Sequence, residues 1–285
     1  LPIERELRSR RLPLGPGVLL GCMGSQVACA PLGRLMVRAR LVGPVAAVEV
    51  IQSFQNNQAE PIEFYYLFPV SQAGSISKFR AQVGQRVCDW QVVPKEQAAN
   101  LAQPTVPPFL GNLFEGEYQT VFCVPLGLVQ PGEVVNIDLA YAELLSSVGG
   151  DFRFSFPLLL SSRFQTGANT TPEAGSDALG LTPGLVAGPN FALSVALEVA
   201  GAAPLKLASS HPLVTHQLPS GELGFELARQ DLPARDFTLT YRLGHEKNPQ
   251  GILRQGRQHF LYHLHPPLSC PPTTTPRHLI LLLDV

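Results

Sequence analysis

The sequence predicts an all-β protein built from antiparallel β-sandwiches, and three observations predict it. Apolar and polar side chains alternate every second residue through much of the 285-residue chain, as they do when one face of a sheet is buried. The 25 glycines and 27 prolines interrupt the chain often, which is typical of many short elements. Only residues 95–102 have a helical composition, and Pro104 ends that stretch. We therefore expect one short helix among many strands.

The first half of the chain contains several clear alternating runs. Residues 62–68 and 152–156 place aromatic side chains at every second position. Residues 118–124 and 134–141 flank the sequence Gln130-Pro131-Gly132-Glu133. Proline fixes φ at the first corner of a type II turn, and glycine accepts the positive φ of the second. We therefore expect these two strands to pair as antiparallel neighbours.

The second half of the chain repeats the pattern. Alternating runs occupy residues 191–199, 222–227, 237–243 and 260–264. Almost no helical sequence separates them, which favours a second antiparallel β-sandwich over alternating strands and helices.

Composition divides the chain into six parts. Residues 1–33 combine glycine and proline without a sustained period, and residues 166–190 are small and polar, so we interpret them as a lead-in and a linker. The prolines of residues 266–276 predict a stiff, extended connector, and the apolar run after them is typical of a strand buried on both faces. The expected parts are a lead-in at 1–33, a first β-domain at 34–165, a linker at 166–190, a second β-rich domain at 191–265, a Pro/Thr-rich connector at 266–276 and a final strand at 277–285.

Charge and hydropathy exclude several classes of partner. The net charge is −1 and the sequence pI is about 6.7, so the chain has no basic surface for nucleic acid or an anionic membrane. No apolar run approaches the ~20 residues of a membrane-spanning helix. The arginine-rich start is a poor match to a signal peptide, and we expect the chain to begin inside a longer protein. The five cysteines show no C-x-x-C or metal-type spacing, so we expect no disulfide framework.

Three histidines near the end of the second half are the candidate metal ligands. His259, His263 and His265 share one side of the strand at 258–265, because residues two apart point to the same face. The pair His263-x-His265 has a spacing that can grip one zinc or copper ion. The alternative is a solvated histidine face, with the intervening apolar side chains directed inward: Phe260, Tyr262 and Leu264.

No catalytic residue is identified in the sequence. A G-x-S-x-G nucleophile motif is absent, and Cys123 lies between two apolar residues of an expected strand. A small buried thiol is the ordinary case at such a position, because a reactive cysteine needs an electropositive, accessible setting. We therefore expect the chain to be non-catalytic.

The order of motifs over residues 34–164 resembles a VIT (vault protein inter-alpha-trypsin) domain. The resemblance rests on five blocks in order: the strand at 45–54 followed by Asn56-Asn57, the acid-aromatic strand 61–69 ending in Phe68-Pro69, the strand Val121-Phe122-Cys123, the sequence 130–133 followed by Asp138-Leu139-Ala140-Tyr141, and Phe154-Ser155-Phe156-Pro157 with Arg163-Phe164. One feature departs from the family, because its Glu/Ala/Tyr-rich helix is shortened to residues 95–102 and followed by the proline-broken residues 103–110.

Two later segments extend the resemblance. His211-Pro212 and residues 235–241 are similar to the β-rich segment that follows VIT in inter-alpha-trypsin heavy chains and their bacterial relatives. Residues 279–284 resemble the first strand of a von Willebrand A domain, which the family ends with D-x-S-x-S. The resemblance implies that Asp284 is a Mg²⁺ ligand in a longer protein. Because the other metal-binding residues are not in this sequence, we expect no cofactor and no magnesium affinity in the chain itself.

The resemblance implies a non-catalytic module for protein–protein interaction or adhesion. A metal ion in the following domain would be completed by a partner's carboxylate. It also implies a secreted or cell-surface protein, with a cytoplasmic protein as the alternative. Two other functions stay open: an unrecognised hydrolase on a β-sandwich scaffold, and a purely structural cell-surface subunit.

Overall fold

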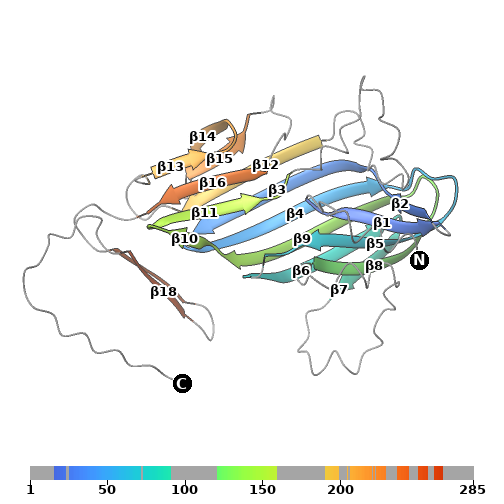
Figure 1. The fold of residues 1–285 in the computed structure, drawn as a ribbon, viewed down its shortest axis with the longest axis horizontal. Helices are drawn as coiled ribbons and strands as arrows, with labels where there is room; N and C mark the ends of the chain where they lie inside the picture. Colours follow the sequence, from blue (N-terminus) through green and yellow to red (C-terminus); the bar gives the residue numbers. More distant parts are fainter. Residues whose placement is uncertain are drawn as a thin grey trace, which may run out of the picture.

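A computed structural model shows that the chain is all-β, which confirms the predicted fold class (Figure 1). The described residues are 16–23, 26–71, 73–90, 121–158, 190–198, 204, 206–219, 221, 223–228, 236–243, 250–255 and 260–265. Within these ranges every regular element is a strand. The predicted helix at 95–102 and the predicted strand at 277–285 lie outside the described residues. The described ranges contain no helix that could cross a lipid bilayer.

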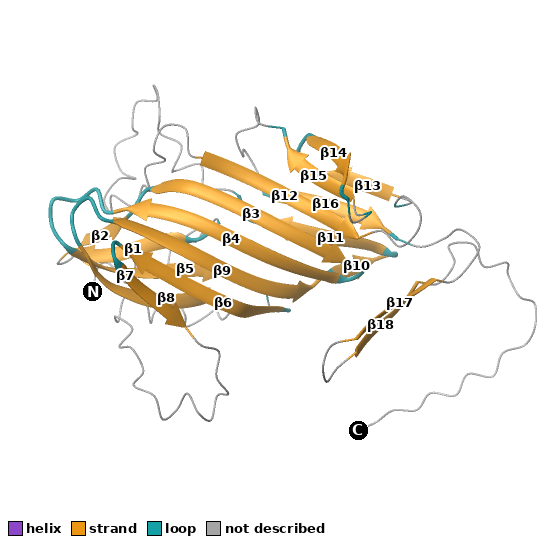
Figure 2. Ribbon diagram, turned by 180° about the vertical axis from the view of Figure 1, so that it is seen from behind, coloured by secondary structure: helices purple, strands orange, loops and turns teal. Residues whose placement is uncertain are grey.

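The largest sheet has eight strands and forms one broad, curved layer (Figure 2). Its order is β14 (Leu213–Gln217), β15 (Leu223–Leu227), β12 (Asn190–Glu198), β3 (Leu32–Val42), β4 (Val45–Gln55), β9 (Val134–Leu144), β6 (Gly74–Val83) and β7 (Arg86–Trp90). Neighbours are antiparallel except β12 and β3, which run parallel from Asn190 opposite Arg34 to Glu198 opposite Val42. The sequence pattern predicts strands but does not distinguish parallel from antiparallel partners.

Two four-stranded sheets and one hairpin make up the rest. One sheet has the order β2 (Gln26–Cys29), β1 (Val18–Met23), β5 (Ile62–Pro69) and β8 (Val121–Val129). The other has the order β10 (Ser146–Val148), β11 (Asp151–Phe156), β16 (Phe237–Arg242) and β13 (Lys206–Ser209). The hairpin of β17 (Gln250–Gln255) and β18 (Phe260–His265) forms a two-stranded sheet of its own (Figure 2).

The core lies between the large sheet and the smaller ones. Buried side chains of all three sheets form one continuous apolar cluster. Tyr66 of β5 packs on Phe79 of β6 with ring centroids 5.6 Å apart, and Phe68 packs at the same distance on Tyr141 of β9. Aromatic pairs at such distances stabilise a sandwich beyond the area they bury.

Strands from the two halves of the chain share both layers. β12 adds to the edge of β3, and β16 adds to β11. The buried hydroxyl of Tyr241 donates a hydrogen bond to the carbonyl oxygen of Gly43 over 2.6 Å. Residues 166–189 lie outside the described part, so the predicted linker stays a prediction.

Part of the predicted lead-in is structural. β1 pairs with β5, and Leu19 is fully buried. Gly21 permits this pairing, because a Cβ there would lie 2.3 Å from Cγ2 of Ile62. Gly21 therefore interrupts the alternation of apolar residues that would predict this strand, while it allows β1 to pack against β5.

The predicted pairing of the strands around residues 130–133 is wrong. The turn itself is present, since Glu133 N donates to Gln130 O over 3.0 Å and Gly132 has φ of 75°. However, β8 and β9 enter different sheets. Asn56 fixes this crossing, because its carbonyl accepts from Gly132 N and its side chain donates to Val129 O. A turn sequence determines where the chain reverses, not which sheet the next strand joins.

Candidate functional site on the open face of the large sheet

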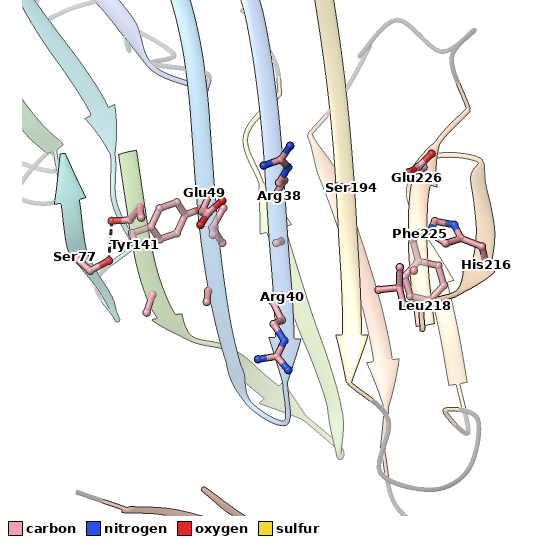
Figure 3. Close-up of a pocket in the computed structure, with 16 residues that line it drawn as sticks. Arg38, Arg40, Glu49, Ser77, Tyr141, Ser194, His216, Leu218, Phe225 and Glu226 are labelled. Carbon is pink, nitrogen blue, oxygen red and sulfur yellow. Dashed lines mark hydrogen bonds between the residues drawn. The ribbon is translucent and has the colours of Figure 1, made fainter. Parts of the chain in front are cut away.

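The outer face of the eight-stranded sheet contains a hollow of about 610 Å³ (Figure 3). Side chains from β3, β4, β6, β9, β12, β14 and β15 contribute to its lining. Both halves of the chain therefore build this hollow, and the pairing of β12 with β3 joins their contributions.

Small side chains make the floor of the hollow. Ala47 of β4 lies opposite Ala142 of β9, and Ala140 is two residues away on the same face. Ser194 of β12 and Gly224 of β15 continue this floor across the sheet. Because these residues project little above the backbone, the sheet surface is recessed here.

Charged side chains stand around the floor. Arg38 and Arg40 project from the same face of β3, and Glu49 of β4 lies opposite Arg38 in the strand register. Within the described residues, Arg38 and Glu49 form no ion pair. Elsewhere on this face Lys78 is paired with Asp138, and Arg80 lies 3.3 Å from Asp89. Arg38 and Glu49 are therefore not paired with each other, unlike these charged pairs farther along the sheet.

His216 and Glu226 form the wall at the β14 side. The imidazole of His216 lies over Gly224, where an added Cβ would be 2.5 Å from Nε2. Glu226 lies opposite Ser194 in the pairing of β15 with β12. Among the described residues, no hydrogen bond connects Ser194, His216 and Glu226.

Burial shifts the protonation of two groups near the end of β9. It raises the pKa of the Tyr141 phenol far above its ordinary value. Burial also raises the pKa of the Glu143 carboxyl, and a hydrogen bond from Ser71 opposes this shift. Burial of these side chains is the larger cause of both shifts.

The structure describes only part of the predicted histidine site. The ring of His263 packs edge-on against Phe152, with centroids 5.4 Å apart. The backbone of His265 lies in β18, whereas His259 and Asp284 lie outside the described residues. The described residues contain no group of three His, Cys, Asp or Glu side chains that could hold a metal ion. The histidine site and the Asp284 site stay predictions.

The alternative interpretation of this strand is wrong about which face is inside. The three side chains expected inside are exposed, with fractions of 75% for Phe260, 58% for Tyr262 and 54% for Leu264. The hairpin joins no larger sheet, and the opposite side, which carries His263, faces Phe152. Alternation correctly separates the two faces but does not identify the buried one.

Cys123 is half-buried on β8, and burial raises the pKa of its thiol to about 11. The thiol is therefore protonated at neutral pH and weakly nucleophilic. Cys29, Cys88 and Cys123 carry free thiols.

The hollow was not found from the sequence. A signal was present, because Ala140 and Ala142 occupy alternate outward positions of one strand, as do Arg38 and Arg40. Bringing these pairs together requires the register of β3, β4 and β9, which the sequence does not specify.

Comparison with known proteins confirms the VIT resemblance. Residues 32–141 match the family described as the vault protein inter-alpha-trypsin domain. The chain is 27% identical over 139 residues to human von Willebrand factor A domain-containing protein 5A, covering 47% of this chain and 18% of that protein. It is 28% identical over 120 residues to the human protein mono-ADP-ribosyltransferase PARP4, covering 42% of this chain and 7% of that protein. The chain thus spans less than a fifth of the length of these relatives.

Solved structures show only a distant likeness. A nutrient-binding protein from Legionella pneumophila, described as putative, has a TM-score of 0.42 and 10% identity, covering 75% of this chain and 67% of that chain. An M1 zinc metallopeptidase from Deinococcus radiodurans has a TM-score of 0.37 and 14% identity, covering 86% and 48%. At these scores the likeness carries no argument about this protein.

Proposed function

We propose that this chain, whose residues 32–141 are a VIT domain related to those of VIT/von Willebrand A proteins, is a non-catalytic protein-interaction module. Its binding surface is the hollow on the outer face of the large sheet. One observation carries the proposal: small side chains recess the centre of an open sheet, and the charged side chains of Arg38 and Glu49 border it without an ion pair to each other.

The hollow suits a protein segment. Its lining is mostly apolar, with polar groups at the margins, which is the usual character of a recognition site. Opposite charges on neighbouring strands favour a partner that presents both a carboxylate and a cation. Such charges set orientation and selectivity more than affinity.

Filling the hollow tests this proposal. Ala140→Trp places an indole on its floor, whereas the control Ser146→Trp adds the same group at an exposed position of β10. Proteins that co-purify with each variant are compared by quantitative mass spectrometry. A partner identified in this way is then purified and titrated calorimetrically.

We expect Ala140→Trp to weaken that partner's affinity at least about tenfold, since a filled site excludes its occupant. Ser146→Trp should bind like the natural protein. Equal binding by both variants, with folding retained, would overturn the assignment of the hollow.

The absence of catalysis and the role of Asp284 are part of the same proposal. In a longer protein, Asp284 would help to hold a Mg²⁺ ion that a partner's carboxylate completes, as the resemblance implies. The chain of 285 residues should show no micromolar magnesium binding by calorimetry. Turnover of broad hydrolase substrates that survives repeated purification would contradict the non-catalytic role.

A further inference from the structure

One edge of the large sheet, β14, lacks the features that usually prevent strand addition. Its sequence Leu213-Val214-Thr215-His216-Gln217 contains no lysine, arginine, carboxylate or proline. Four of its five residues are exposed, and the side chain of Val214 is 55% exposed. Edge strands of this kind are templates for another strand.

Several other sheet edges in the described part are protected. β7, at the opposite edge of the large sheet, carries Arg86 and Asp89. Arg86 also donates to the carbonyl oxygens of Leu126 and Leu128 on the edge strand β8, over 2.8 and 3.2 Å. In the third sheet, β10 has three residues and β13 begins with Lys206. β2 and β18 also lack charged residues and proline, but of the two edges of the large sheet only β14 lacks them.

The register shows which backbone groups of β14 point outward. Ala228 N donates to Pro212 O over 3.3 Å, which makes these residues a hydrogen-bonded pair. Hydrogen-bonded pairs alternate along an antiparallel ladder, so Val214 and His216 bond toward β15. The N–H and C=O groups of Leu213, Thr215 and Gln217 therefore point away from the sheet.

We propose that β14 pairs antiparallel with β14 of a second copy of this chain, with Thr215 opposite Thr215 of the partner. The outward residues are symmetric about Thr215, so a two-fold axis there brings each outward N–H opposite an outward C=O. Leu213 then faces Gln217, and Val214 faces His216. No like charges meet, and opposed threonines are a favourable pair in antiparallel sheets.

This pairing continues the large sheet across the two-fold axis. The axis is perpendicular to the sheet, so the two hollows open on the same side. His216 borders both the hollow and the new junction. The dimer thus presents two hollows together, and a partner with two binding segments gains avidity without any new contact. This inference does not depend on what the hollow binds.

The test combines sedimentation equilibrium with hydrogen exchange on the whole chain. We expect the mass to rise toward that of two chains as concentration increases. The amides of Thr215 and Gln217 should gain protection over the same concentration range. Thr215→Pro removes an outward N–H but no bond to β15, and proline is tolerated at such edge positions. It should weaken association at least about tenfold, whereas Thr215→Val, which keeps the N–H, should not.

Gln217→Pro is a second variant at the other end of the outward set, in case Thr215→Pro does not fold. Circular dichroism and thermal melting establish folding of each variant. A chain that stays monomeric at every concentration overturns the inference. So does a dimer whose β14 amides are unprotected or whose association survives both proline variants. Partner binding that Ala140→Trp abolishes in a monomeric chain would leave the proposed function standing while removing the dimer.

Discussion

Gln52 is fully buried in the middle of the sandwich and links three elements. Its side-chain nitrogen donates to Pro16 O over 3.1 Å, and its side-chain oxygen accepts from the hydroxyl of Tyr66 over 2.6 Å. Burying an amide costs little stability when its polar atoms are hydrogen-bonded. The hydrogen bonds of Gln52 connect β4 to β5 and to the segment before β1.

Removing one member of this network should be costly. Tyr66→Phe leaves Oε1 of Gln52 without its donor, so we expect the free energy of unfolding to fall by about 1–3 kcal/mol. Tyr262→Phe is the control, because Tyr262 is 58% exposed and its change should stay within about 0.5 kcal/mol. Urea denaturation measures both. Equal effects would show that the network adds no stability.

The raised pKa of Glu143 predicts that this group destabilises the folded chain at neutral pH, which is the reverse of the usual effect of a carboxylate. Burial raises the pKa of this carboxyl above its ordinary value of 4.5 in the folded chain. The folded state therefore favours the protonated acid, and the resulting stability is lost as pH rises through the folded pKa. Glu143→Gln, which stays neutral, should raise the melting temperature at pH 7, and the difference should disappear below pH 4.5. A variant less stable at pH 7 would contradict the burial of this group.

At the level of elements, a substitution in β1 tests whether the region before residue 34 is packed into the fold. Gly21→Ala places a Cβ 2.3 Å from Ile62 Cγ2 and 2.9 Å from Glu63 O. Overpacking of this kind should cost about 1–3 kcal/mol. Gly33→Ala is the control, because it makes the same substitution but its added Cβ would lie 3.7 Å from Ser53 O, an ordinary van der Waals distance. If the two variants have the same melting temperature, β1 is not packed as described.

The strands were largely predictable from the sequence, while their partners were not. Alternation over residues 237–243 predicted β16, which buries one face. Alternation over residues 62–68 also predicted β5, although Tyr65 and Leu67 on its second face are buried as well. The turn at 130–133 was also correct, but its strands joined different sheets. Which strands pair depends on contacts between residues far apart in the sequence, such as the hydrogen bonds of Asn56 to Val129 and Gly132. The local pattern of apolar residues does not encode such contacts. The hollow was missed for the same reason.

At the scale of the whole molecule, the two halves of the chain stabilise each other. A chain ending at residue 165 would leave β3 without β12 and β11 without β16. It would also expose core side chains such as Phe154 and Phe156, which are fully buried in the complete chain. Long, unpaired apolar edges of this kind promote aggregation.

We therefore expect residues 1–165 to be insoluble or unfolded when expressed alone. Gel filtration and circular dichroism of the truncated and complete chains provide the measurement. A soluble, monomeric, cooperatively melting fragment would mean that the first half is an independent domain.

The most direct test of the central claim uses floor positions on both sides of the β12–β3 junction. Ala140 lies on β9, in the first half of the chain, and Ser194 lies on β12, in the second. The affinity of one purified partner is measured by calorimetry for Ala140→Trp, Ser194→Trp and the natural protein. A single surface built by both halves predicts that each substitution weakens binding at least about tenfold while folding is retained. Full affinity in either folded variant would contradict it.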